Sequence, residues 1–183
     1  MPSQATREIT DEKEEKLSKN IRELIQKTLT AYSPPVEDFK QRVVALHDEH
    51  LEICCLAEAL IQRMTLANDR QYQRAINLYG TIIKNENLID KLNDLANRAV
   101  ELDKNLSEAI TRTNEAIELL AQLMDIESAY GNDEIVTFLR DQIDKFQKHH
   151  EALQELRNTL LPVKERVEGT LREIRGFRYR YWY

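Results

Sequence analysis

Glycine and proline are scarce in this chain, with four residues of each among 183. Average proteins contain about 12% of these two residues together, so the chain has few residues that favour turns. A β-sandwich or a doubly wound sheet of this length needs many more turns than they provide. The scarcity therefore argues against the sheet-rich classes and favours long helices.

Long apolar runs and cysteine pairs are also missing. No apolar run approaches the roughly 18 residues of a membrane span, and the N-terminal Met1-Pro2-Ser3-Gln4 is polar, unlike a secretory leader. The two cysteines, Cys54 and Cys55, are adjacent. Because neighbours on a helix point about 100° apart, a mutual disulfide is not expected, and free thiols indicate a reducing compartment. We expect a cytoplasmic protein without a membrane span.

Charge is plentiful but unevenly distributed. Charged residues make up 32% of the chain and hydrophobic ones 42%, a profile typical of amphipathic helices with solvated outer faces. The net charge is −6, yet the last twelve residues carry four arginines against Glu173. The rest of the chain is therefore strongly acidic, which argues against broad nucleic-acid binding because phosphate contacts need a basic face.

The first half of the chain predicts two or three helices. Residues 1–9 are expected to be a flexible lead, after which Thr10 caps a helix whose apolar stripe ends at Tyr32. Pro34 then opens a helix over 34–67, with Val36, Val43, His50, Ala57 and Met64 on one heptad seam. The amphipathic stretch 69–84 contains Gly80, and whether it is a separate helix stays open.

The second half predicts a helical hairpin. A seven-residue repeat of leucine and alanine from Leu88 to Tyr130 favours one long helix, and Gly131 lies where a C-terminal cap belongs. The last helix covers 133–175, with a kink at Pro162 and an end at Gly176. The fold class is therefore all-α, an elongated antiparallel helical bundle or coiled coil of four to five helices, with 10–175 as a single domain.

The four histidines form two candidate groups, His47 with His50 and His149 with His150. If the helices that carry them run parallel, the histidines share one level, as in metal sites inside helical bundles. The Glu-x-x-His pairs of the carboxylate-bridged iron proteins are absent, however. The preferred interpretation is that His50 and His150 are polar seam residues, and we expect neither a metal nor another cofactor.

The C-terminal segment 176–183 has an unusual composition. Phenylalanine and tyrosine occupy every second position there and alternate with arginine or tryptophan. This period of two fits an extended strand with an aromatic face. Aromatic side chains and arginine are enriched where proteins bind partners. The candidate partner-binding residues are Arg175, Phe177, Arg178, Tyr179, Arg180, Tyr181, Trp182 and Tyr183. Packing of this segment onto its own bundle is the alternative.

These observations favour a non-enzymatic helical scaffold or adaptor that binds a protein partner, associates with itself, or both. The familiar phosphate-binding, zinc-binding and nucleophile motifs are absent from the sequence. Two alternatives stay open. One is a metal-binding bundle that uses the four histidines, and the other is nucleic-acid or membrane attachment through the arginine-aromatic segment.

Overall fold

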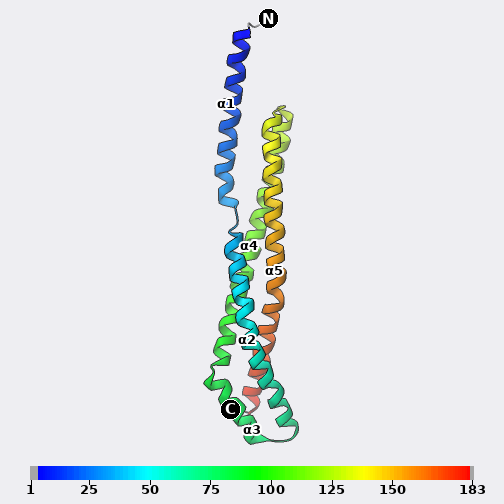
Figure 1. The fold of residues 1–183 in the computed structure, drawn as a ribbon. Helices are drawn as coiled ribbons and strands as arrows, with labels where there is room; N and C mark the ends of the chain where they lie inside the picture. Colours follow the sequence, from blue (N-terminus) through cyan, green and yellow to red (C-terminus); the bar gives the residue numbers. More distant parts are fainter. Residues whose placement is uncertain (1–3, 182–183) are drawn as a thin grey trace. The chain divides into compact units, whose positions relative to one another are not determined.

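The computed structural model describes the backbone of residues 4–181, and the side chains of all these positions except 6, 9 and 178–181. Within this part of the chain the protein is all-α and contains no strand, which confirms the predicted class. The elements are α1 (Gln4–Leu29), a 3-10 turn η1 (Thr30–Tyr32), α2 (Val36–Asp69), α3 (Gln73–Asn85), α4 (Leu88–Ala129) and α5 (Asp133–Tyr181) (Figure 1).

The helices form two compact units. Unit 1 comprises Met1–Pro35 with Glu108–Leu153, and unit 2 comprises Val36–Ser107 with Gln154–Tyr183. The long helices α4 and α5 each contribute one part to each unit. The expectation of a single domain over 10–175 stays a prediction.

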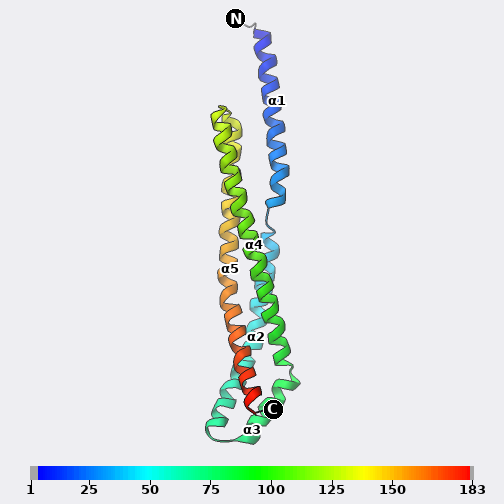
Figure 2. The same cartoon turned by 180° about the vertical axis from the view of Figure 1, so that it is seen from behind.

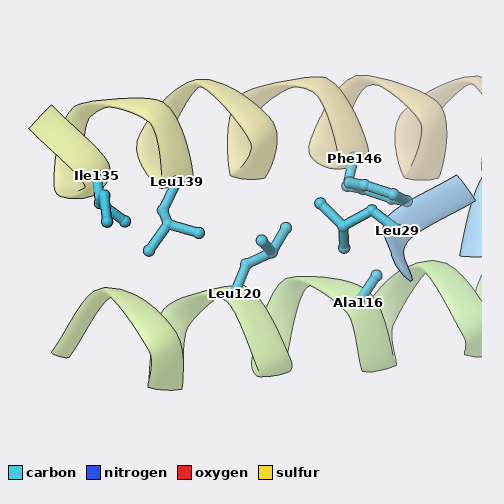
Figure 3. Close-up of a cluster of buried hydrophobic side chains, with 6 residues drawn as sticks. All are labelled: Leu29, Ala116, Leu120, Ile135, Leu139 and Phe146. Atoms are coloured by element: carbon cyan, nitrogen blue, oxygen red, sulfur yellow. The ribbon is translucent and has the colours of Figure 1, made fainter. Parts of the chain in front are cut away.

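Unit 1 packs α1 against the C-terminal part of α4 and the N-terminal part of α5, an arrangement seen from both sides in Figures 1 and 2. Its core is a cluster of buried side chains from these three helices (Figure 3): Leu29, Ala116, Leu120, Ile135, Leu139 and Phe146. The turn between α4 and α5 contains Gly131 at φ +73°, a backbone conformation that glycine adopts without strain. The predicted glycine cap is therefore present.

Unit 2 contains α2, α3, the first part of α4 and the last part of α5. Apolar side chains from all four helices are buried in it, among them Phe39, Met64, Ile76, Leu95 and Val167. Two non-glycine residues with positive φ make its turns, Gln71 (φ 60°) before α3 and Asn87 (φ 52°) before α4. The stretch whose status was open is thus a separate helix.

Two predicted helix boundaries and one predicted strand are wrong. α1 begins at Gln4, so residues 4–9 are helical rather than a lead and the helix does not start at Thr10. α5 continues through Gly176 to Tyr181, so the glycine does not end it. The prediction of an extended strand after Gly176 is wrong for residues 176–181, because propagating an existing helix costs little. The expectation that α5 continues past Pro162 is confirmed.

Candidate functional site: the polar cluster of unit 2

Arg166 of α5 lies at the centre of a polar cluster that joins α5 to α2. Its Nε donates to Glu58 Oε1 at 2.8 Å and its Nη2 donates to Glu58 Oε2 at 2.9 Å. Nη1 lies 3.5 Å from His50 Nε2, and Nη2 also reaches Cys55 Sγ at 3.6 Å. One guanidinium thus contacts three side chains of α2, and the paired contact with Glu58 fixes its orientation.

His50 is buried in this cluster, with only 4% of its surface exposed. Its Nδ1 lies within hydrogen-bond distance of the carbonyl oxygen of His47. A carbonyl only accepts, so Nδ1 carries the ring proton and Nε2 presents its lone pair to Arg166. Burial lowers the pKa of His50, and the charge of Arg166 lowers it further. A neutral His50 is therefore the form that fits the site.

The remaining members of the cluster have their own electrostatic signatures. The hydrogen bonds from Arg166 lower the pKa of Glu58, and those same contacts raise the pKa of the guanidinium. Thr170 also donates to Glu58 Oε1, at 3.4 Å. Both cysteines are free, Cys54 buried and Cys55 exposed, and burial raises the pKa of the Cys54 thiol. The cluster balances one cation against one carboxylate, which suits it to holding helices together.

Two further ion pairs connect the helices of unit 2. Asp103 of α4 accepts a hydrogen bond from Arg157 Nε at 2.9 Å and lies 3.6 Å from Lys164 Nζ, both on α5. Arg98 of α4 contacts both carboxylate oxygens of Glu49 on α2, at 2.5 and 3.2 Å. Together with the Arg166 cluster, these contacts link α2, α4 and α5 pairwise. Each of these ion pairs joins two helices, so their role is to stabilise the packing of unit 2.

The histidines do not gather in one place. His47 and His50 belong to unit 2, where the neighbour of His50 on α5 is Arg166, whereas His149 and His150 belong to unit 1. The prediction that the four share one level is therefore wrong. Among the described residues, no group of three or more histidine, cysteine, aspartate or glutamate side chains is arranged to hold a metal ion. The seam position predicted for His50 agrees with its burial.

The predicted partner-binding segment begins on a helix that is packed against its own unit. Arg175 Nη2 donates to Asn93 Oδ1 of α4 at 2.6 Å, and Ile174 is fully buried. Phe177 is half-buried. The side chains of Arg178, Tyr179, Arg180, Tyr181, Trp182 and Tyr183 lie outside the described residues. The assignment of this segment to partner binding stays a prediction.

An open pocket of about 660 Å³ lies where α3 meets α4. It is lined by Asn77, Gly80, Thr81, Ile83, Lys84, Asn87, Ile89 and Asp90. Its two charged lining residues, Lys84 and Asp90, are exposed to solvent. The pocket is therefore a shallow, solvated surface without the apolar enclosure that small-molecule sites usually have.

The sequence did not reveal the Arg166–Glu58 pair, although each residue flanks a predicted seam. Glu58 follows the buried Ala57, and Arg166 precedes the buried Val167. Charged residues beside a seam are typical of ion pairs between helices. Matching the two requires the axial offset between α2 and α5, which heptad spacing leaves undetermined.

Comparisons with models of protein families, with curated proteins and with solved structures gave no match. Among the described residues, none of the helices combines the length and the apolar character needed to cross a membrane.

Proposed function

We propose that this protein is a non-enzymatic helical scaffold that binds other protein chains through exposed apolar rows on its helices. The carrying observation is the pair Leu17 and Leu24 of α1, which are 60% and 64% exposed. Exposed apolar rows of this kind are typical of surfaces that bind a partner.

α1 has more apolar surface than its own unit covers. Ile21, Ile25 and Leu29 face the core of unit 1, whereas Leu17 and Leu24 do not. Because these two leucines are seven residues apart, they lie along nearly one line of the helix. The row they form is turned about 90° from the centre of the packed face, by the geometry of about 100° per residue. It is therefore a second apolar row, which the unit leaves exposed.

The charges beside this row indicate what it binds. Lys13, Lys16 and Lys27 are exposed and lie on the side of the row that faces away from the core. An amphipathic helix with acidic residues beside its own apolar row complements both features. We infer that a helix of this type is the partner of α1.

The polar residues of unit 2 support a structural role over a catalytic one. Arg166, Glu58 and Asp103 bind side chains on neighbouring helices rather than face a cleft. Two free cysteines are consistent with the reducing, cytoplasmic location that we propose. We retain the segment from Arg175 to Tyr183 as a second recognition element. It lies at the end of α5, where Arg175 donates a hydrogen bond to Asn93 of α4.

Photocrosslinking tests the α1 row. A benzoylphenylalanine residue in place of Leu24 is expected to give one discrete adduct in cells that express the protein. The crosslinked peptide should come from an amphipathic, acidic helix. The matched control is the same substitution at Lys19, an exposed position on the opposite flank of the packed face.

Two variants make this result specific. L17E should abolish the Leu24 adduct because it places a charge in the apolar row, and the pair K13E/K27E should weaken it at least several-fold. The absence of any adduct from Leu24, or equal adducts from positions 24 and 19, would contradict the proposed function.

The C-terminal element is tested by truncation after Phe177. This end point keeps Ile174 buried and retains the Arg175–Asn93 hydrogen bond, so the helix should stay folded. If the segment recognises a partner, a crosslinker at Tyr181 of the full-length protein gives an adduct that added peptide 178–183 suppresses, and the truncated protein no longer binds that partner. An adduct that the peptide leaves unchanged would count against this role.

A further inference from the structure

Another apolar row lies along the exposed side of α2 in unit 2, next to the contact between Cys55 and Arg166 of α5. Val44 is 50% exposed, Leu51 is 40% exposed and Leu66 is 56% exposed. Cys55 is exposed on the same face. At about 100° per residue these positions fall within about 60° of one another. The buried Leu46, Ala57 and Met64 lie on the opposite side of the helix.

The row is roughly symmetric about Cys55, with residues of similar or complementary character at equal distances on both sides. Val44 and Leu66 are each eleven residues from Cys55, Asp48 and Gln62 are each seven away, and Leu51 and Ala59 are each four away. A row with this symmetry matches itself when a second copy runs in the opposite direction. Two-fold symmetric contacts in homodimers have this self-complementary character.

We propose that α2 binds α2 of a second copy of this chain, antiparallel, with Cys55 at the two-fold axis. In this arrangement Val44 packs against Leu66 of the other copy, and Leu51 packs against Ala59. Asp48 accepts a hydrogen bond from the Gln62 amide. The two Cys55 side chains face each other.

Charges at the ends of the row select the antiparallel direction. Lys40 lies fifteen residues before Cys55 and Asp69 lies fourteen residues after it, and both are exposed. An antiparallel pair places Lys40 beside Asp69 of the other copy at each end. A parallel pair would place lysine beside lysine and aspartate beside aspartate. Such pairs contribute more to direction and register than to affinity.

The contact is long and narrow. The thirty residues from Lys40 to Asp69 extend about 45 Å along the helix, yet only three large apolar side chains per copy lie in the row. Interfaces at the small end of the range form weak, concentration-dependent complexes. The dimer is therefore expected to dissociate with a Kd of about 1–100 µM.

This proposal deepens the scaffold function by naming one partner and uses a surface separate from the α1 row. Crosslinking of the full-length protein with a short bis-maleimide tests the centre of the contact. The native protein and C54S should give a covalent dimer, since Cys54 is fully buried. C55S should give none. The proposal is overturned if the native protein stays monomeric at about 100 µM by sedimentation.

A charge swap tests direction and register. K40D and D69K each place like charges together in the antiparallel dimer and should raise the Kd about three- to tenfold. The double variant K40D/D69K restores opposite charges and should return the Kd to its original value. No rescue by the double variant, with all proteins equally helical by circular dichroism, overturns the antiparallel pairing.

The two proposals fail separately. A monomeric protein whose Leu24 position still captures an acidic helix retains the scaffold function and loses the α2 dimer. A dimer that crosslinks at Cys55, in a protein without any adduct at Leu24, retains the α2 contact and loses the α1 row.

Discussion

Arg166 offers the clearest test at the scale of single residues, because it contacts Glu58, His50 and Cys55 together. We predict that Arg166→Met lowers the free energy of unfolding by about 1–2 kcal/mol. A surface ion pair is worth less than that, but this contact is paired, partly buried and shared with further acceptors. Urea unfolding followed by circular dichroism measures the change.

The matched control for this variant is Arg172→Met, which removes an exposed arginine from the same helix. It should change stability by less than about 0.5 kcal/mol. Equal effects of the two substitutions would show that the contacts of Arg166 contribute nothing beyond those of a solvated side chain.

The lowered pKa of His50 predicts how the stability of the protein depends on pH. Burial, aided by the charges of Arg166 and of His47, lowers its pKa from 6.5. The unfolded chain therefore takes up this proton more readily than the folded one. Stability should be complete above pH 6.5 and fall as the pH drops from there through the lowered pKa of the folded state. His50→Gln should flatten this fall, as measured by urea unfolding at about pH 7.5 and 5.5.

His149→Gln and a control substitution complete the pH test. His149 should contribute in the same direction, because burial and the nearby Lys145 lower its pKa as well. The control is His150→Gln, on α5 in unit 1, whereas His50 belongs to unit 2. If His50→Gln leaves the pH dependence as steep as in the native protein, the neutral form of His50 inferred from the Arg166 cluster is wrong.

His50 also shows what the sequence can and cannot specify at this scale. Heptad spacing placed it on the seam of α2, and it is buried there. The same spacing did not identify Arg166 as its neighbour, because sliding one helix along another by a heptad preserves the seam and changes every polar partner. The prediction that the four histidines share one level was therefore wrong.

At the scale of elements, turns with strong local signals were predicted well. Pro34 and Pro35 precede α2, and Gly131 separates α4 from α5, so both boundaries fall within two residues of the prediction. The ends of the chain were predicted poorly. Gly176 and the alternating aromatic pattern are weak local preferences, whereas α5 is already formed and packed up to Ile174, so its extension is favoured.

Two glycines separate the effect of backbone conformation from that of packing. Gly131→Ala should lower the free energy of unfolding by about 1 kcal/mol, because a Cβ at φ +73° is strained although no atom lies within 4 Å of it. Gly169→Ala, inside α5 and equally uncrowded, should raise it by about 0.5–1 kcal/mol. Thermal unfolding of both variants measures the two effects. Shifts of the same sign would contradict the positive φ at Gly131.

At the scale of the whole molecule, the two units differ in what stabilises them. Most of the buried apolar side chains among the described residues belong to unit 2, which also contains the Arg166 cluster. The core cluster of unit 1 has six buried members, and eight partly buried hydrophobic residues pack around it. Unit 1 also contains buried polar atoms without a hydrogen bond at Arg22, Gln142 and His149, each of which costs stability.

Unequal stability should appear in hydrogen exchange, measured by mass spectrometry on the full-length protein. We predict the fastest exchange in α1 before Ser18, where the described side chains are all exposed. Peptides around Leu120 and Leu139 should follow, and those around Leu95 and Val167 should exchange last. Dilution supplies the control, because slow exchange in α1 that disappears on dilution reveals a bound partner chain. Slow exchange there that persists at all concentrations would contradict the exposed state of α1, and with it the apolar row on which the proposed function depends.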